Sequence, residues 1–498
     1  MNLPDYASWQ KMANDFIHQS KAFIDGEYVD ALSGKTYETV NPATEKMSAH
    51  IAACDANDVD KATKSARAVF DAGHWSRMAA RDRGAVLQKL AGLVQENANK
   101  LALMESLNVG KPIMEARMAD INLASQALKW YGEAIDKLTD EIIATPESVR
   151  ATITREPMGV VGVVVPWNFP LLMACWKIAP ALAAGNSVIV KPSEQTPQSI
   201  LKLAELAIEA GIPDGVFNVI TGIGPEAGAA IGLHNDIDCL TFTGSTAVGK
   251  KFLEYSGRSN MKAVWLECGG KNPNIVMADC PNMDKAVMNA AMNVFFNQGE
   301  VCAAASRLLV EESIKDEFVE RVTAIGKTRI PGDPLNPDTN LGAIVDKNQY
   351  DRINGYIAKG QEEGAEMILG GDTATVDGKG LFIKPTVFKN VNNDMVIARE
   401  EIFGPVLAAI SFKNIDEAIK IANDSPYGLA AGIWTRDINV AHKAAREIQA
   451  GSVSINSYSS IDIALPFGGY KQSGIGVDKS LHAIEKYTNI KSTWLELD

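Results

Sequence analysis

Short apolar runs and helical stretches alternate through the middle of the chain. Runs rich in β-branched residues occupy 160–165, 187–190, 217–220, 240–243 and 263–266. Between them, apolar residues recur at helical spacing over 171–184, 197–210, 225–233 and 247–255. This alternation is typical of a parallel sheet with helices on both faces. A second alternating region, with Pro- and Gly-rich connections, extends from Asn274 to about Asn456, so the pattern predicts an α/β fold with two such units.

The region before residue 140 is mainly helical in pattern. Two short apolar runs around an Asp-Gly turn predict a hairpin at 22–29. Helical signals follow from residue 58 to 138, and Asn57 is the candidate cap of the first helix. A long amphipathic helix is expected over 81–107, and a third helix over 115–138.

Two further segments have the alternation of extended strands. They occupy 146–156 and 488–497, and neither has an obvious pairing partner in its own neighbourhood. Because exposed strands are usually covered or paired, these segments predict a subunit interface, and hence a homodimer or homotetramer.

The composition is that of an ordinary globular protein. A chain of 498 residues is too long for one hydrophobic core, so two or three domains are expected. A net charge of −13 argues against nucleic acid or an anionic membrane as a partner. The longest apolar run, 160–176, contains two prolines and an asparagine and is too short to cross a bilayer.

Cysteine and histidine are scattered along the chain. The six cysteines include no CxxC pair, and the six histidines form no HExxH or HxxEH pattern. Neither a disulfide framework nor a metal site is expected, and the spacing favours a reducing compartment. Since the N-terminus lacks the apolar stretch of a signal peptide, a cytoplasmic location is predicted.

The stretch 297–307 contains the strongest candidate for chemistry. Its Cys302 is closely preceded by Gly299 and followed by small residues, which leaves room for a substrate to reach the sulfur. A lone cysteine is more commonly a small apolar residue packed in a core. The candidates at other strand ends therefore decide between the two interpretations.

Two of these strand ends are suited to a nucleotide. In the turn 242–249, Gly244 and Gly249 permit close approach, and Ser245 can cap the helix so that its N-terminus receives a phosphate. A plain strand-to-helix turn explains this spacing equally well. After another strand, Lys191 can contact phosphate or ribose oxygens, and Glu194 can accept ribose hydroxyls and repel a 2′-phosphate. A solvated Lys/Glu pair is the alternative.

Two polar residues in this region have the character of catalytic groups. Asn168 lies in the segment PWNFP, where two prolines hold it as a rigid amide donor for an oxyanion. Glu267 ends a predicted strand immediately before a flexible cysteine–glycine–glycine segment and can act as a general base. A loop asparagine bonded to its own backbone and a surface glutamate are the ordinary alternatives.

Together these pieces strongly resemble the aldehyde dehydrogenase superfamily, from about residue 23 to the C-terminus. The matching blocks are 166–170, 191–194, 242–249, 267–271, 297–307, 400–405 and 466–471, in the family's order. The resemblance implies a Rossmann-like dinucleotide domain, a second α/β catalytic domain and a small β oligomerisation arm. The corresponding ranges are 1–140 with 159–269, 270–468, and 141–158 with 469–498.

The resemblance also implies roles for the candidate residues. Cys302 attacks an aldehyde, Asn168 and the backbone N–H of Cys302 hold the oxyanion, and Glu267 activates the water that releases a carboxylic acid. The expected cofactor is NAD, with NADP left open. Its implied contacts are Pro166, Trp167, Lys191, Glu194, Gly224, Phe242, Gly244, Ser245, Val248, Glu401 and Phe403.

Two residues depart from the family pattern. Some relatives carry a second glutamate that assists the base, and the matching position here is Asp478, whose shorter side chain leaves Glu267 to act alone. Cys268 stands where many relatives have an aliphatic residue, and we interpret it as packing.

The resemblance suggests a substrate cavity with aromatic walls and acidic residues at its mouth. Phe169, Trp176, Phe296 and Phe467 are expected to line it, although such residues are often only core. Asp120 and Asp462 are expected near the mouth, where paired acids attract an aldehyde that ends in an amine or guanidinium. Two solvated acids are the alternative.

The segments 476–483 and 130–137 resemble the γ-glutamyl-γ-aminobutyraldehyde dehydrogenase branch of putrescine breakdown. An amino- or guanidino-aldehyde of polyamine catabolism is therefore the expected substrate, and a neutral aliphatic or aromatic aldehyde is the alternative. A coenzyme-A-acylating enzyme is disfavoured because it generally lacks the base at Glu267. A thiol hydrolase needs a histidine partner, and a non-catalytic scaffold would have lost Cys302 or Glu267.

Overall fold

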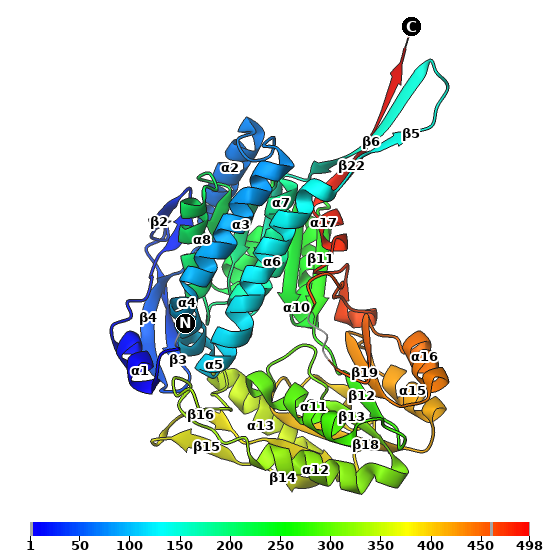
Figure 1. The fold of residues 1–498 in the computed structure, drawn as a ribbon. Helices are drawn as coiled ribbons and strands as arrows, with labels where there is room; N and C mark the ends of the chain where they lie inside the picture. Colours follow the sequence, from blue (N-terminus) through cyan, green and yellow to red (C-terminus); the bar gives the residue numbers. More distant parts are fainter. Residues whose placement is uncertain (1–2, 459–461, 498) are drawn as a thin grey trace.

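Two sheets, one above the other in Figure 1, organise the chain, and a three-stranded arm projects from the upper one. The computed structural model describes residues 3–458 and 462–497. The predicted α/β fold is confirmed, since parallel strands alternate with covering helices in both sheets.

The first sheet has the order β2-β1-β9-β8-β7-β10-β11-β21, and its central strands β9 to β11 are parallel. These central strands confirm the predicted parallel run, and the predicted hairpin is β1 and β2, joined antiparallel to the sheet at β9. The strands are β1 Ala22–Ile24, β2 Glu27–Val29, β7 Val160–Val164, β8 Ser187–Lys191, β9 Phe217–Val219, β10 Cys239–Gly244, β11 Ala263–Cys268 and β21 Gly474–Ile475.

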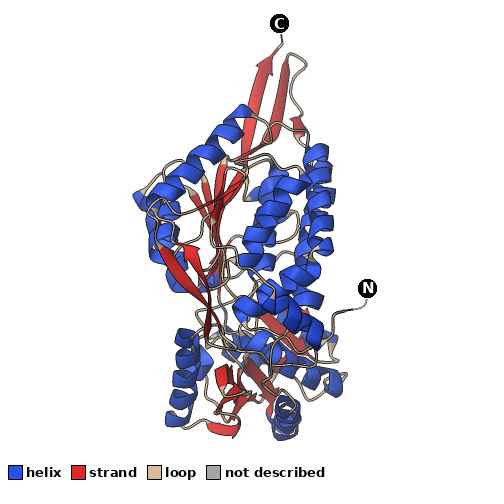
Figure 2. Ribbon diagram, turned by 90° about the vertical axis from the view of Figure 1, so that its left-hand side faces the viewer, coloured by secondary structure: helices blue, strands red, loops and turns tan. Residues whose placement is uncertain are grey.

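Helices cover both faces of this sheet (Figure 2), because successive strand residues point to opposite sides. Val161 and Val163 of β7 pack into the core under α3, α6, α7 and α8, whereas Val160 and Val164 pack into the core under α2, α9 and α10. The helices are α1 Tyr6–Asn14, α2 Ala56–Ala72, α3 Ala80–Glu96, α4 Ala98–Val109, α5 Ile113–Glu115, α6 Ile121–Ala134, α7 Pro170–Ala184, α8 Gln198–Ala210, α9 Ala229–Leu233, α10 Thr246–Arg258 and α17 His482–Glu485.

Two predictions about the N-terminal helices were wrong in detail. The helix expected over 81–107 divides at Asn97 into α3 and α4, and α4 is buried on nearly all sides, so its residues lack a polar face. The first helix begins after Asp55 and not after Asn57. Asp55 and Asp58 form a capping box there, which satisfies two of the free N–H groups at the helix start.

The second sheet has the order β14-β17-β18-β13-β12-β19-β20, and all its strands except β14 are parallel. The strands are β12 Pro273–Val276, β13 Arg307–Glu311, β14 Glu366–Leu369, β17 Thr386–Lys389, β18 Val406–Phe412, β19 Ala430–Trp434 and β20 Ser452–Ile455. The helices are α11 Met283–Phe295, α12 Lys315–Lys327, α13 Lys347–Glu362, α14 Val396–Arg399, α15 Ile415–Asn423 and α16 Ile438–Glu447. Two small hairpins, β3 Thr36–Asn41 with β4 Lys46–Ala52 and β15 Thr373–Val376 with β16 Lys379–Ile383, complete the strands outside the arm.

The arm corrects the prediction of two unpartnered strands. β6 (Val149–Pro157) and β22 (Thr488–Glu496) pair with each other antiparallel, and β5 (Glu141–Ile143) pairs with the other edge of β6. Figure 1 shows this sheet extending away from the body, and Ile490 and Trp494 of β22 are 72% and 62% exposed. Within the described residues, no helix has the length and apolar character needed to span a membrane.

The chain between the second sheet and the arm returns to the first sheet. β21 pairs antiparallel with β11, so that Gly474 lies opposite Glu267. Phe467 and Asp478 exchange two backbone hydrogen bonds of 2.8 and 2.7 Å. The C-terminal segment that includes β21 therefore packs against the carboxyl end of β11, where the first sheet faces the second.

Candidate active site

The loop that carries Cys302 has an unusual backbone. Asn297, Gln298 and Gly299, directly after α11, have φ angles of 48°, 56° and 75°. A Cβ on Gly299 would lie 2.2 Å from the carbonyl group of Gly404, so only glycine allows the two loops this approach. The result is a half-buried Cys302 at the inner end of a cavity.

Asn272 fixes the conformation of this loop. Its Nδ2 donates to the carbonyl oxygens of Cys302 (2.8 Å) and Ala304 (3.0 Å), and its Oδ1 accepts from the N–H of Ala430 (3.0 Å). Tyr458 adds a hydrogen bond from its hydroxyl to the intervening carbonyl, at 3.0 Å. Neither residue is predicted from the sequence, because a single buried asparagine or tyrosine carries no local pattern.

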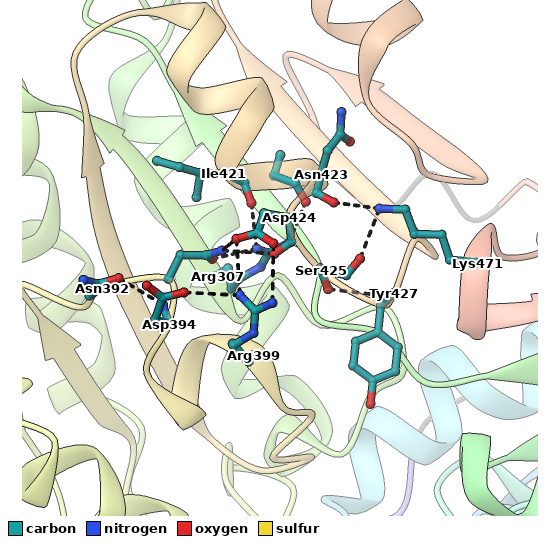
Figure 3. Close-up of polar contacts among 12 residues, drawn as sticks. Arg307, Asn392, Asp394, Arg399, Ile421, Asn423, Asp424, Ser425, Tyr427 and Lys471 are labelled. Carbon is teal, nitrogen blue, oxygen red and sulfur yellow. Dashed lines mark hydrogen bonds and ion pairs between the residues drawn. The ribbon is translucent and has the colours of Figure 1, made fainter.

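Arg307, the last residue of the cysteine block, anchors the loop from its other end. Its Nε donates to the carbonyl of Lys271 at 2.9 Å, and its Nη atoms donate to those of Ile421 (3.0 Å) and Ala422 (2.9 Å). Lys471 donates to two carbonyls of the adjoining turn, at 2.7 and 3.1 Å (Figure 3). Arg307 and Lys471, from two different blocks of the family pattern, therefore both stabilise the loops around residues 421–425 next to the site.

Asn168 is positioned to donate to a ligand oxygen. Its side chain is buried, and its Nδ2 donates one hydrogen to the carbonyl of Glu300 at 2.9 Å, which leaves a second N–H. Lys111 holds the backbone by donating to the Asn168 carbonyl at 2.7 Å. Within the described residues, the backbone N–H of Cys302 has no hydrogen-bond acceptor. The hydrogen bond to Glu300 thus brings the Asn168 amide to the cysteine segment, where two N–H donors remain available to a ligand.

Glu267, in β11, is a buried carboxyl without a hydrogen-bond partner in the described part of the chain. Burial raises its pKa to about 8, with Lys177 lowering it and Asp478 raising it further. Burial, followed by the charges of Glu267 and Glu401, also raises the pKa of Cys302 well above that of a free thiol. The two groups therefore influence each other's ionisation, as a nucleophile and its neighbouring base would.

Asp478, the residue at the position of the family's second glutamate, is fully occupied. Its Oδ2 lies 2.7 Å from Nζ of Lys177, and its Oδ1 is paired with Lys486. Although burial alone acts in the opposite direction, these two lysines bring the pKa of Asp478 to about 2. Asp478 stays ionised and acts on Glu267 through its charge, together with Lys177.

A cavity of about 420 Å³ leads to Cys302. Its lining includes the four aromatic residues expected there, namely Phe169, Trp176, Phe296 and Phe467. The rings of Phe169 and Phe296 are stacked with centroids 6.3 Å apart, and those of Trp176 and Phe467 meet at 61° and 5.6 Å. The walls are thus mainly apolar, which suits an aldehyde with a flexible chain or a ring.

The expected pair of free acids at the cavity mouth is not formed. Asp120 lines the cavity, but it is only 1% exposed and its Oδ2 lies 2.5 Å from Nζ of Lys111. Its charge is therefore already paired, because a buried carboxylate needs a partner and Lys111 provides it, and the role of Asp120 toward the substrate stays a prediction. Asp462 is exposed and lies outside the residues that line the cavity, so its role stays a prediction.

The residues expected to hold a cofactor lie at the carboxyl edge of the first sheet. The chain passes from β7 to β8 on one side and later to β10 on the other, so a topological switch point lies between β7 and β10. Ligands bind at such points in open α/β sheets. Pro166 and Trp167 follow β7, Gly244 ends β10, and Ser245 caps α10 by accepting from the N–H of Val248 at 3.4 Å.

The remaining cofactor candidates surround this edge. Lys191 ends β8, and its Nζ lies 3.3 Å from Oε2 of Glu194. No atom lies within 4 Å of a Cβ built on Gly224, and Val248 leaves 39% of its apolar side chain exposed. An open helix start, an exposed apolar residue and a Lys/Glu pair fit a nucleotide. The ring of Phe242 lies beneath Gly244, where a Cβ would meet it at 2.5 Å.

Glu401 and Phe403 reach the site from the second sheet. The N–H of Gly270 donates to Oε1 of Glu401 at 3.1 Å, and a Cβ on Gly269 would lie 2.0 Å from Oε2, so a side chain at position 269 would displace the Glu401 carboxylate. Phe403 meets Trp167 edge to face, with centroids 5.2 Å apart. The loop therefore spans the gap between the two sheets beside Cys302.

Sequence analysis also missed Lys479, which lines the cavity and is only 2% exposed. It directly follows Asp478 in the run 476–483, yet nothing in its spacing distinguishes it from a solvated lysine. Among the described residues, no group of three or more His, Cys, Asp or Glu could hold a metal ion.

Comparison with known proteins agrees with this geometry. A family model described as "Aldehyde dehydrogenase family" matches residues 28–493. The chain is 49% identical to the NADP/NAD-dependent aldehyde dehydrogenase PuuC of Escherichia coli, over all of both chains. Among solved structures it is similar to an indole-3-acetaldehyde dehydrogenase complexed with NAD+ (TM-score 0.98, 51% identity, 99% of this chain and 100% of that one). It is also similar to the γ-glutamyl-γ-aminobutyraldehyde dehydrogenase of Burkholderia cenocepacia (TM-score 0.97, 48% identity, the same coverage).

Proposed function

The chain belongs to the aldehyde dehydrogenase family, and from this premise we propose its residue roles and its substrate class. It is an NAD(P)-dependent enzyme that oxidises an aldehyde to a carboxylic acid. The proposed substrates are amino- or guanidino-aldehydes of polyamine catabolism, of the γ-glutamyl-γ-aminobutyraldehyde type. The observation that carries the proposed chemistry is a half-buried thiol in the cavity lining, with the buried carboxyl of Glu267 close enough to shift its pKa and the Asn168 amide bonded to Glu300, two residues before it.

Cys302 is the proposed nucleophile. Its thiol first gives its proton to the neighbouring carboxylate of Glu267, which releases that proton to solvent before the hydrolysis step. The sulfur then forms a bond to the aldehyde carbon, and the carbonyl electron pair moves onto the oxygen. The free Nδ2–H of Asn168 and the backbone N–H of Cys302 donate to that oxygen. Losing one such donor typically costs about 2.7–4 kcal/mol of transition-state stabilisation. The backbone of both residues is held by other side chains, so the donors are in place before the substrate arrives.

When bound, the nicotinamide cofactor supplies an acceptor for the hydride that leaves the tetrahedral carbon. Lys191 and Glu194 would hold its adenosine ribose, and Glu401 and Phe403 would hold its nicotinamide ribose. The other proposed cofactor residues would contact its adenine and pyrophosphate or line its path between the sheets. They are Pro166, Trp167, Gly224, Phe242, Gly244, Ser245 and Val248. The thioester left on Cys302 is then hydrolysed. Glu267 takes a proton from the attacking water, and the sulfur leaves as a thiolate.

The pH dependence of thioester hydrolysis tests the role of Glu267. Burial raises the pKa of this carboxyl to about 8, and a base must be deprotonated to accept a proton, so the hydrolysis rate should rise with pH up to about 8. The decay of the acyl-enzyme in single turnovers measures this rate. In Glu267→Gln the inflection should disappear. A hydrolysis rate that is flat between about pH 6 and 9 would contradict the assignment.

Relatives and the cavity both support the substrate class. One similar solved structure is a γ-glutamyl-γ-aminobutyraldehyde dehydrogenase, 48% identical over 99% of this chain. The aldehyde dehydrogenase PuuC of Escherichia coli is 49% identical over the whole chain. The cavity, with a volume of about 420 Å³, has room for an extended aliphatic chain. A neutral aromatic or aliphatic aldehyde is the second candidate, because aromatic residues dominate the walls and another relative is an indole-3-acetaldehyde dehydrogenase.

A substrate panel decides between these candidates. NAD(P)H formation is followed with γ-glutamyl-γ-aminobutyraldehyde, 4-aminobutyraldehyde, 4-guanidinobutyraldehyde, hexanal and indole-3-acetaldehyde. The highest kcat/KM is expected within the first three. A higher value for hexanal or indole-3-acetaldehyde would favour the second candidate. The rate should be unaffected by coenzyme A, since the base at Glu267 supports hydrolysis.

Replacement of Glu194 should change the choice of cofactor. The carboxylate near the proposed ribose site disfavours a 2′-phosphate, so Glu194→Gln should raise kcat/KM for NADP relative to NAD by about tenfold. Initial rates with each cofactor at saturating aldehyde measure this ratio. Glu209→Gln, an exposed glutamate of α8, is the matched control. An unchanged ratio in Glu194→Gln would remove Glu194 from the cofactor site.

We further propose the predicted division into domains, together with a homodimer or homotetramer in the cytoplasm. The two sheets support domains at 1–140 with 159–269 and at 270–468, and the arm supports a bridging unit at 141–158 with 469–498. The exposed apolar residues on β22 support pairing of the arm with a second copy. The free cysteines of the described chain support a reducing compartment.

A further inference from the structure

Lys479 is a buried cation that faces the substrate cavity. It lines the cavity and is 2% exposed. Its Nζ lies 5.2 Å from the ring centroid of Trp176 and 5.6 Å from that of Phe467, both of which also line the cavity. In the described part of the chain, this ammonium group has no hydrogen bond and no ion pair. Three N–H donors are therefore available on the cavity side.

The acids nearest to Lys479, Asp462 and Asp478, stabilise its charge only through space and do not contact it. Both oxygens of Asp478 are taken by Lys177 and Lys486, and Asp120 is paired with Lys111. Asp462 influences Lys479 only through space, from an exposed position outside the cavity lining. Burial lowers the pKa of Lys479 to about 8, so its ammonium remains mostly protonated at neutral pH. The cavity thus contains a positive charge without an anion in contact.

The backbone around Lys479 is strained and firmly held. Lys479 and Ser480 have φ angles of 60° and 51°, a conformation that residues other than glycine adopt at a cost. On one side, Asp478 exchanges two backbone hydrogen bonds with Phe467. On the other, the hydroxyl of Tyr131 donates to the carbonyl of Ser480 at 3.0 Å. These hydrogen bonds hold the backbone at Lys479 in its strained conformation and so restrict the direction of its side chain.

A purely structural lysine on aromatic rings has a different environment in this same protein. Lys111 lies 4.1 Å from the ring centroid of Phe169, but it also contacts the carboxylate of Asp120 and the carbonyl of Asn168. Its charge and its donors are satisfied by the protein. Lys479 has the ring contacts without the acceptors, and the missing acceptor is what a ligand in the cavity can supply.

We propose that Lys479 binds a carboxylate at the far end of the aldehyde substrate and so determines specificity. This inference rests on the proposed function and narrows it. Within that substrate class, it favours aldehydes whose amine is acylated and whose tail ends in a carboxylate, as in a γ-glutamyl conjugate. An aldehyde with a bare terminal ammonium would place like charge next to Lys479 and should be used less well.

Pairs of substrates that differ only in charge test this proposal. Straight-chain aldehydes that end in a carboxylate are compared with their methyl esters, in wild type and in Lys479→Met, which keeps the length and apolar contacts of the side chain. The wild type should favour the acid over the ester by about tenfold or more in kcat/KM, mainly through KM. Lys479→Met should abolish this preference while oxidising the ester at nearly the wild-type rate. Lys479→Arg should retain most of it.

The control is Lys129→Met, which removes an exposed lysine on α6 and changes the net charge equally. It should leave the ratio of acid to ester unchanged. An unchanged ratio in Lys479→Met, or an equal loss for acid and ester, would overturn the proposal. If Lys479→Met does not fold, the wild type decides, since equal or better use of the esters would also overturn it.

The outcome for Lys479 is separable from that of the proposed substrate class. If the wild type prefers acids over esters through Lys479 but does not oxidise γ-glutamyl-γ-aminobutyraldehyde efficiently, the proposed substrate fails and the carboxylate site stands. If γ-glutamyl-γ-aminobutyraldehyde is the best substrate and Lys479→Met retains the preference for acids, the carboxylate site fails and the proposed function stands.

Discussion

Cys302→Ser is expected to reduce aldehyde-dependent NAD(P)H formation by about 10,000-fold or more, because every later step depends on the carbon–sulfur bond. A serine hydroxyl is a far weaker acid and a weaker nucleophile than the thiol it replaces, and Glu267 and Glu401, which already raise the pKa of Cys302, oppose a negative charge at this position. No histidine belongs to the site to compensate. The loss should be found in kcat, measured by NAD(P)H absorbance at saturating aldehyde.

The matched control is Cys280→Ser, which makes the same change in a buried cysteine outside the cavity lining. It should keep activity within about twofold of wild type, since small losses of packing rarely alter a distant site. Both variants should bind NAD with wild-type affinity by fluorescence titration. If Cys302→Ser retained the wild-type kcat, the assignment of the nucleophile and the mechanism built on it would be wrong.

Glu267→Gln should separate the two halves of the reaction. The glutamine preserves shape and burial but cannot take a proton from water, so the thioester should form and then hydrolyse about 100 to 10,000 times more slowly. Stopped-flow absorbance should show a burst of about one NADH per active site, followed by a slow steady state. Mass spectrometry should find the acyl group on Cys302.

A control variant and one alternative result test the assignment of Glu267 as the base for hydrolysis. Glu254→Gln, an exposed glutamate of α10, should give wild-type kinetics. If Glu267→Gln showed no burst and a lower rate of the first turnover, Glu267 would act mainly on the ionisation of Cys302. The pKa coupling between the two groups makes that comparison necessary.

The alternation of apolar runs and helical stretches was enough to predict both sheets. Strands such as β7 and β8 are buried on both faces, so their sequences are continuous β-branched runs that cannot be mistaken for surface elements. Local patterns failed where a neighbour decided the outcome. The break between α3 and α4 at Asn97 is one case, and the pairing of β6 with β22 across more than 300 residues is another.

The candidate site divides in the same way. Cys302, Asn168 and Glu267 lie in sequence blocks whose glycines and prolines indicate an unusual backbone conformation. At Gly299, for example, the backbone lies so close to Gly404 that no side chain fits. Residues without such marks were missed. Asn272 and Lys479 are distinguished only by their three-dimensional surroundings, because no local sequence pattern marks either residue.

The sequence by itself determined the α/β architecture and the order of the strands along the chain, because these depend on residue type and local spacing. Its motif blocks also identified the family by resemblance and supplied the candidate residues for the chemistry. Only the tertiary structure decided the ionisation and the partners of those groups. Asp120 is paired with Lys111, Asp478 is held between two lysines, and Lys479 has no carboxylate in contact with it in the described part of the chain. Charge pairing depends on distances of a few ångströms between residues far apart in the chain, and burial sets its strength.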